Sequence, residues 1–101
     1  MIARVFRAKA LPGKEGELEQ EIRQGSVSLV KDRKGLVTYY AGRPIGRTGD
    51  EFVMITIWKE LATVKAFAGP DWEKAVISDR MAPLLDSRSL GHFEIFAEAT
   101  L

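Results

Sequence analysis

Residues 51–58 constrain the fold most, because they alternate like a β-strand and are largely apolar on both faces. One face carries Val53, Ile55 and Ile57, and the other carries Phe52, Met54, Thr56 and Trp58. A strand of this kind belongs inside a sheet that is covered from both sides. The chain must therefore cover two faces of a sheet itself or use a second molecule as one of the covers.

The rest of the chain divides into segments with strand or helix periodicity. The predicted strands are residues 2–10, 36–41, 51–58 and 91–97, and the predicted helices are residues 14–33 and the segment containing Leu61, Val64 and Phe67. Gly69 and Pro70 interrupt the second helix. Asp71 is then expected to cap a short further helix that carries Trp72, Ala75 and Val76 on one side.

The first predicted helix has an inward stripe that is small in its middle. At 100° per residue, Leu18, Ile22 and Leu29 share this stripe with Gly25 and Ser26. Two interpretations stay open. The small residues let the helix sit close to the sheet, or they leave space for a flat aromatic ligand.

This order, β-α-β-β-α-β, predicts a single α+β domain over residues 1–101, with a ferredoxin-like fold and an antiparallel four-stranded sheet. Right-handed crossovers put both helices on one face of the sheet. The other face then needs a cover from outside the chain, since an exposed apolar sheet face usually marks an interaction surface. We expect a homodimer in which a second copy supplies it.

Composition narrows the class of partner. Fifteen Lys and Arg against fourteen Asp and Glu give a formal net charge of +1, so we expect neither nucleic acid nor a membrane as partner. The chain has no cysteine and one histidine, His92, so we expect no metal site. Residues 1–9 alternate apolar with basic residues and resemble no secretory signal, which favours a cytoplasmic protein.

Three segments carry a resemblance to a known family: residues 57–60 (IWKE), 66–75 (AFAGPDWEKA) and 92–95 (HFEI). With them the chain resembles the antibiotic biosynthesis monooxygenase family of dimeric α/β barrel proteins. The resemblance implies the ferredoxin-like fold and a homodimer. It also implies a choice among activities, because the family includes cofactor-independent oxygenases of phenolic or quinol-type compounds, quinol monooxygenases, haem-degrading enzymes and members without known activity.

The haem-degrading branch is disfavoured residue by residue. Its members have a haem-ligating His where Ile77 stands, a Trp where Phe67 stands and an Asn where Arg7 stands. Isoleucine cannot ligate iron. We therefore expect no haem bound in that manner.

The candidate site combines a proton acceptor, a hydrogen-bond donor and aromatic walls. His92 is the candidate base, because only its side chain has an ordinary pKa near neutrality, and Trp58 is the candidate donor through its indole N–H. The candidate substrate-binding residues are Trp72, Tyr39, Phe67 and Arg43. For Trp58 and Trp72 simple packing is the alternative, for His92 a surface or packing role, and for Arg43 a solvated loop.

If the family chemistry applies, the chain is a cofactor-independent monooxygenase, and its partners are a small phenol or hydroquinone and dioxygen. The substrate supplies the electrons, and the protein supplies a dry pocket, orientation and a proton acceptor. Two alternatives stay open. One is a dimer of the same fold that isomerises or cleaves a metabolite without oxygen, and the other is a non-catalytic ligand-binding dimer.

Overall fold

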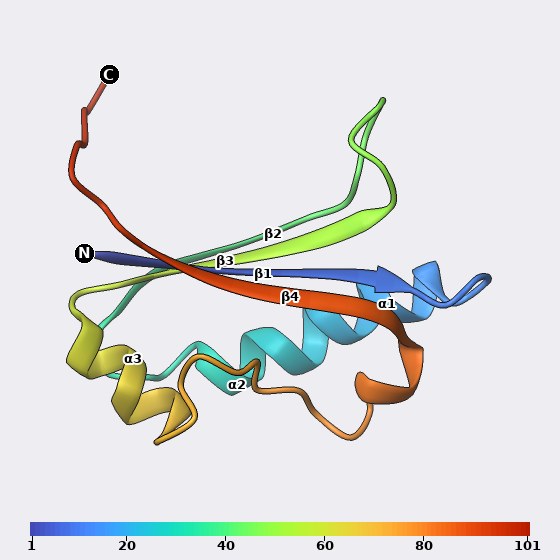
Figure 1. Cartoon of the computed structure of the whole chain (residues 1–101), viewed down its shortest axis with the longest axis horizontal. Helices are drawn as coiled ribbons and strands as arrows, with labels where there is room; N and C mark the ends of the chain where they lie inside the picture. The colour runs from blue at the N-terminus through green and yellow to red at the C-terminus, as the bar shows by residue number, and fades with distance from the viewer.

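An antiparallel four-stranded sheet in the order β2-β3-β1-β4 organises the computed structural model, which describes residues 1–101 (Figure 1). The strands are β1 (Ile2–Ala10), β2 (Leu36–Gly42), β3 (Glu51–Trp58) and β4 (Leu85–Glu94). The bounds of β1 and β3 are those predicted from the sequence. The α+β ferredoxin-like fold is confirmed, with β1 and β3 at the centre of the sheet.

All helical elements lie on one side of this sheet (Figure 1). The first helix is continuous and consists of α1 (Glu15–Glu21), the π-helical segment η1 (Ile22–Ser26) and α2 (Val27–Val30). The second is α3 (Leu61–Ala68), and a 3₁₀ turn, η2 (Ala82–Leu84), precedes β4. No helix is long and apolar enough to cross a membrane.

The π-helical segment sets which side chains of the first helix face the sheet. Leu18, Ile22, Ser26 and Val30 are all buried, at steps of four residues. Such steps drift by about 40° each in a regular α-helix, but a π-turn holds more residues per turn and offsets the drift. The predicted stripe is correct for Leu18, Ile22 and Ser26. Leu29 is more exposed than its neighbour Val30 but lines the hollow described below, whereas Gly25 does not line it and lies against the Glu21 side chain.

The segment after α3 corrects the sequence prediction. Residues 70–73 form turns, and no helix begins at Asp71. The reason lies in the backbone carbonyls of Trp72 and Lys74, which accept hydrogen bonds from the side chain of Arg4. In a helix these carbonyls would bond to later backbone N–H groups instead.

Strand β4 is longer than predicted at its start and shorter at its end. It pairs with β1 from Ile2 to Ala10, so it begins at Leu85 rather than at residue 91. The start of β4 was not predicted because residues 86–89 are all exposed and polar. An edge strand need not alternate in polarity. The ladder stops at Glu94 because β1 itself begins at Ile2.

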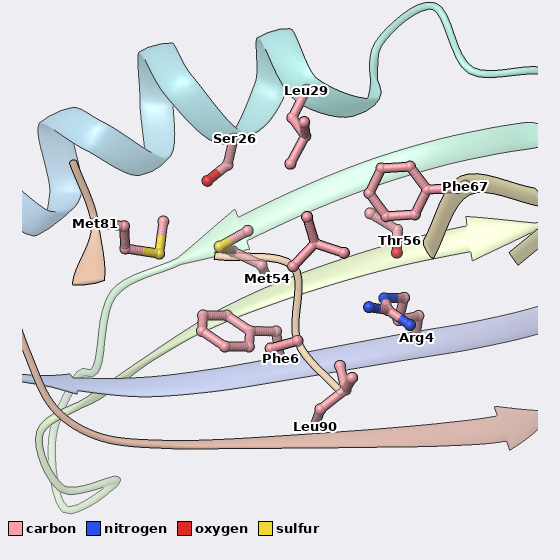
Figure 2. Close-up of a pocket in the computed structure, with 11 residues that line it drawn as sticks. Arg4, Phe6, Ser26, Leu29, Met54, Thr56, Phe67, Met81 and Leu90 are labelled. Atoms are coloured by element: carbon pink, nitrogen blue, oxygen red, sulfur yellow. The ribbon is translucent and has the colours of Figure 1, made fainter. Parts of the chain in front are cut away.

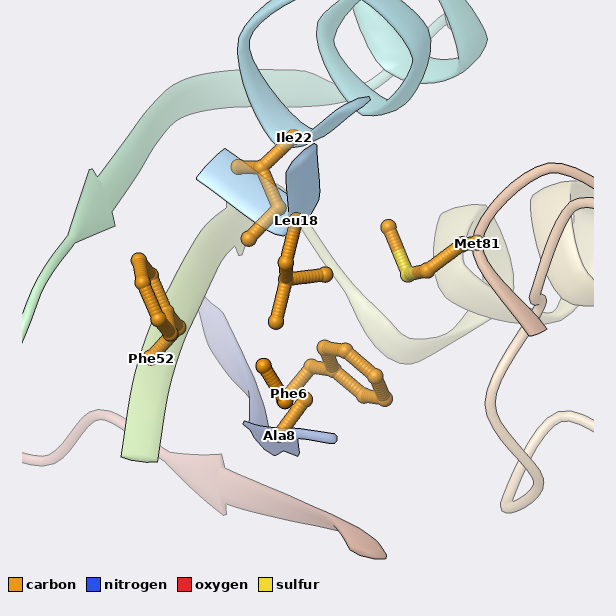
Figure 3. Close-up of a cluster of buried hydrophobic side chains, with 7 residues drawn as sticks. Phe6, Ala8, Leu18, Ile22, Phe52 and Met81 are labelled. Atoms are coloured by element: carbon orange, nitrogen blue, oxygen red, sulfur yellow. The ribbon is translucent and has the colours of Figure 1, made fainter. Parts of the chain in front are cut away.

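The core lies between the sheet and the first helix (Figure 3). Its buried members are Phe6, Ala8, Ala10, Leu18, Ile22, Phe52 and Met81. The opposite sheet face, which we call the outer face, carries the side chains of Val5, Ile55, Tyr40 and Phe93 and has no cover within the chain. Tyr40 and Phe93 are 61% and 60% exposed there.

Candidate functional site

A row of polar residues crosses the sheet on its helix-covered face. In the strand register, Tyr39 of β2 pairs with Thr56 of β3, Thr56 pairs with Arg4 of β1, and Arg4 pairs with His92 of β4. The neighbouring inward positions of β1 and β3 are apolar, such as Phe6 and Met54. The row therefore places four hydrogen-bonding side chains in an otherwise apolar layer.

Arg4 is the centre of this row. It is only 6% exposed. Its Nη1 group donates to the carbonyl oxygen of Trp72 at 2.6 Å and to Nε2 of His92 at 2.8 Å, and its Nη2 group donates to the carbonyl oxygen of Lys74 at 3.2 Å. The guanidinium also lies 5.8 Å from the centre of the Phe67 ring, in cation–π geometry. Burial lowers the pKa of Arg4 from its ordinary value.

His92 is oriented by Arg4 and by Trp72. Since a guanidinium has no acceptor, Nε2 of His92 must accept the hydrogen bond from Arg4, and the neutral ring carries its proton on Nδ1. The His92 ring meets the Trp72 ring edge to face, with centroids 4.9 Å apart. Burial, followed by the charge of Arg4, lowers the pKa of His92 below its ordinary value, against an opposing effect of Glu73.

Trp58 is fully buried behind the row. Its indole Nε1–H donates to Oγ1 of Thr56 at 2.8 Å, and its ring stacks on Phe67 at 5.1 Å between centroids. The indole donor predicted from the sequence is thus engaged by Thr56. Because Oγ1 accepts from Trp58, the Thr56 hydroxyl hydrogen is free to donate elsewhere.

A hollow lies between the polar row, the first helix and the segment that follows α3 (Figure 2). Its empty space is about 480 Å³, which includes its open mouth. The lining is mostly apolar and consists of Arg4, Phe6, Ser26, Leu29, Met54, Thr56, Phe67, Ala75, Val76, Met81 and Leu90. In Figure 2, Arg4, Thr56 and Phe67 gather at one end, and Met54 and Met81 lie toward the other.

The structure gathers most of the predicted site residues around this end. Phe67 lines the hollow, and Trp58, Trp72 and His92 stand directly behind the lining residues Phe67, Thr56 and Arg4. Ser26 also lines the hollow, as the interpretation of the small stripe as space for a ligand requires.

Tyr39 and Arg43 lie outside this hollow. The Tyr39 hydroxyl is buried without a hydrogen-bond partner, and burial raises its pKa. Arg43 is exposed and forms a bidentate ion pair with Glu19, with Nε–Oε1 and Nη2–Oε2 distances of 2.8 and 3.0 Å. It borders a separate hollow beside α1 with Phe52 and Ile22.

Arg4 and Thr56 are the site residues that the sequence analysis did not select. Their signal is a polar side chain at an inward position of a strand: Arg4 shares a face with Phe6 and Ala8, and Thr56 shares one with Met54 and Trp58. Elsewhere, no group of three or more His, Cys, Asp or Glu side chains is placed to hold a metal ion.

Comparison with known proteins agrees with this architecture. The antibiotic biosynthesis monooxygenase family matches residues 1–76, and no curated protein matches the sequence. A structure of the haem-degrading protein MhuD of Mycobacterium tuberculosis, with two haems in its active site, is 18% identical with a TM-score of 0.75, over 99% of this chain and 100% of that one.

Two further solved structures are similar over nearly the whole chain. A variant of SnoaB, a cofactor-independent oxygenase from Streptomyces nogalater, is 16% identical with a TM-score of 0.73, over 96% of this chain and 94% of that one. A protein of unknown function from Nitrosomonas europaea is 21% identical with a TM-score of 0.74, over 99% and 93%. At these identities the likeness concerns the fold.

Together, the sheet, its one-sided helical cover and the open apolar hollow between them define an α+β ferredoxin-like domain. The chain belongs to the antibiotic biosynthesis monooxygenase family.

Proposed function

We propose that this protein is a cofactor-independent monooxygenase of a small phenol or hydroquinone. The observation that carries the proposal is the apolar hollow with Arg4 and Thr56 at one end and His92 hydrogen-bonded directly behind Arg4. A flat aromatic ring suits the apolar walls, and its hydroxyl group suits the polar end. Membership of the family supports the reaction type.

In the proposed reaction the substrate provides all the electrons. The phenol loses its O–H proton to His92, an electron-rich ring carbon forms a C–O bond with dioxygen, and the resulting peroxide anion takes the proton back from His92 to become a hydroperoxide. Loss of the proton on that carbon and cleavage of the O–O bond leave a quinone carbonyl and one molecule of water. One oxygen atom enters the product, the other enters water, and the four electrons that reduce dioxygen come from the ring.

The side chains divide this work between orientation and proton transfer. His92 is neutral near pH 7 because its pKa is lowered, so it is in the form that accepts a proton. Its Nε2 atom accepts from Nη1 of Arg4, so proton transfer requires this hydrogen bond to open while the substrate oxygen binds the free N–H groups of Arg4. Trp58 acts through Thr56, whose hydroxyl it orients. Phe67 is the aromatic wall of the hollow, and Trp72 packs against His92 behind the lining. The predicted binding roles of Tyr39 and Arg43 stay predictions.

Two alternatives use the same hollow. One is an isomerase or lyase reaction without oxygen, with His92 as the proton acceptor, and the other is ligand binding without turnover. Haem degradation is disfavoured: Ile77 packs against the core, and Arg7 is exposed on β1 and follows Phe6, whose side chain faces the hollow. Turnover that persists without oxygen separates the first alternative from the oxygenase.

We also propose that the protein is a homodimer that pairs through the outer face. Every helical element lies on the other side, and residues 43–50 and 95–101 project on the uncovered side at opposite ends of the sheet (Figure 1). Phe96 in the C-terminal segment is 98% exposed, with no cover from its own chain. A second copy related by a twofold axis covers the outer face and Phe96 in one arrangement.

Oxygen uptake over a panel of hydroquinones and phenols tests the proposed reaction. Purified, metal-free protein should consume oxygen and form quinone, and His92→Ala should lower the rate by a factor of about 10²–10⁴. Trp58→Phe should lower it less, since the ring is kept and only the indole donor is lost. Absence of uptake above buffer for every substrate, or equal uptake by His92→Ala, would contradict the assignment.

A matched pair of serine variants tests whether the hollow is the site. Ser26→Leu fills the hollow from the first helix, so oxygen uptake should be lost. Ser28→Leu adds the same side chain two residues further along the helix, at an exposed position, and should keep the activity. Equal activity of the two variants would mean that the active site is not in this hollow.

A further inference from the structure

Arg4 is a buried cation without an acidic partner. It is 6% exposed, and no carboxylate forms an ion pair with it, whereas Lys9, Lys14, Arg23 and Arg43 all form such pairs at the surface. Its hydrogen-bond partners are two backbone carbonyls and a neutral imidazole ring. A buried charge is costly unless an opposite charge compensates it. The site therefore lacks a negative charge that would compensate the charge of Arg4.

Arg4 lines the hollow and also has donors without a partner in the chain. A guanidinium has five N–H groups, and three of them are used by Trp72, His92 and Lys74. The Nε–H group and one N–H of Nη2 have no partner in the chain. Arg4 lines the hollow, and Figure 2 shows its guanidinium beside Thr56 and below the Phe67 ring. The Thr56 hydroxyl, which accepts from Trp58, adds a donor at the same end.

The other charged groups around this end are mostly cations. The Arg33 guanidinium lies 5.3 Å from the centre of the Phe67 ring, and Nζ of Lys65 lies 5.6 Å from that of Trp72. Glu73 is the carboxylate that acts on His92, and its effect there is weaker than those of burial and of Arg4. The electrostatic environment at this end therefore favours an anion over a neutral group or a cation.

We propose that the hollow binds its aromatic ligand as the phenolate, with the oxyanion on the free N–H groups of Arg4 and on the Thr56 hydroxyl. This inference rests on the proposed function for the substrate class, but it concerns binding and requires no turnover. Arg4 supplies the positive charge of the site, and the phenolate supplies the compensating negative charge that Arg4 lacks within the chain. The ring occupies the apolar part of the hollow.

The ionisation of bound 4-nitrophenol tests this inference directly. Its phenolate is yellow and its neutral form is not, so absorption spectra of the complex report the protonation state of the ligand itself. We expect the wild-type protein to lower the pKa of the bound ligand by about 1–3 units, because an opposite charge at hydrogen-bond distance favours the ionised form. A shift of this size means that the protein binds the phenolate about ten to a thousand times more tightly than the neutral phenol.

Two variants of Arg4 and one control complete the experiment. Arg4→Gln removes the charge but keeps an amide donor and should abolish the shift, while Arg4→Lys keeps the charge and should restore part of it. Arg47→Gln makes the same charge change in the exposed loop between β2 and β3 and should leave the shift unchanged. Binding of 4-nitroanisole, which cannot ionise, should persist in Arg4→Gln and shows that the hollow is still formed.

The outcomes separate this inference from the proposed reaction. A lowered ligand pKa in the wild type that is lost in Arg4→Gln supports phenolate binding, even if no hydroquinone is oxidised. Failure of the wild type to bind nitrophenolate, an unshifted ligand pKa, or an equal shift in Arg4→Gln that binds 4-nitroanisole would overturn it, even if oxygen uptake is observed. If neither Arg4 variant folds, the wild-type spectrum alone still decides whether the bound anion is favoured.

Discussion

Nη1 of Arg4 lies 2.8 Å from Nε2 of His92, although the two residues are 88 positions apart in the chain. They face each other because β1 and β4 pair in a register that aligns their Cα atoms. The contact joins the strongest base in the row, a guanidinium that is always protonated, to the one side chain that titrates near neutrality. It fixes the tautomer of His92 and ties its proton affinity to the charge of Arg4.

The first prediction concerns the titration of His92. We expect its pKa to lie below the ordinary value of 6.5, because burial and then the charge of Arg4 disfavour the imidazolium. Arg4→Gln removes the second cause, so the pKa should rise toward the ordinary value. NMR of the imidazole C–H protons measures this without ambiguity, since the chain has one histidine. A pKa at or above 6.5 in the wild type would contradict the burial of the ring.

The same shift predicts how stability depends on pH. Well above pH 6.5 His92 is neutral in both the folded and the unfolded chain, so it contributes no pH dependence there. As the pH falls below 6.5, the unfolded chain binds a proton that the folded chain resists, and the free energy of unfolding decreases until the folded pKa is reached. Urea denaturation at several pH values should show this decrease, and His92→Gln should remove that part of it.

A third prediction concerns the hydrogen bond between Trp58 and Thr56. Thr56→Val keeps the shape of the side chain but leaves the buried indole N–H without an acceptor, which costs about 1–3 kcal/mol. Thr56→Ser keeps the hydroxyl and is the matched control. Urea denaturation of both variants measures the difference. Equal free energies of unfolding would mean that another acceptor, such as water, replaces Thr56.

A fourth prediction uses two glycines with the same backbone conformation. Gly35 and Gly13 have φ angles of 86° and 84°, so alanine is strained at both, by about 1–2 kcal/mol. Only at Gly35 would the added methyl group collide with the side chain of Thr63, which holds the start of α3 through its hydrogen bond to Glu60. Gly35→Ala should therefore cost about 1–3 kcal/mol more than Gly13→Ala in thermal or urea unfolding. Similar losses would show that α3 moves aside at little cost.

The fifth prediction concerns the outer face. Ile55 lies in its middle, paired with Val5 on one side and Tyr40 on the other. We expect the wild type to sediment as a dimer at micromolar concentration and Ile55→Glu to be a folded monomer, because a charge there would be buried unpaired in the interface. Leu11→Glu, in the turn after β1, is the control and should remain a dimer. A folded wild-type monomer would exclude pairing through this face.

Much of the fold follows from local sequence patterns. Strand β3 was predicted with its observed bounds because its side chains alternate and two glycine- or charge-rich segments flank it. The first helix was predicted from its period of 3.6 residues, and the order of elements then left one topology with both helices on the same side. The break at Gly69 was predicted correctly, because α3 ends at Ala68 and the positive φ of Gly69 is a local backbone property.

The site was only partly predictable. His92, Trp58 and Trp72 were selected for their residue types, and Phe67 comes from a segment that carries the family resemblance. The structure pairs Trp58 with Phe67 and Trp72 with His92. Arg4 and Thr56 were missed, because an arginine or threonine in a strand is ordinary until it is known which face is buried and which residues stand beside it. Arg43 was selected from a loop that the structure turns toward Glu19 instead of the hollow.

The sequence by itself determined the period of each element, and hence which side chains share a face, because periodicity is a property of consecutive residues. Only the tertiary structure decided which residues of different elements are neighbours in space. The register of β1 with β3 and β4 aligns Arg4 with Thr56 and His92. In the segment after α3, which is not helical, two backbone carbonyls accept hydrogen bonds from Arg4. Contacts of this kind join residues up to 88 positions apart, and they depend on packing that no local pattern records.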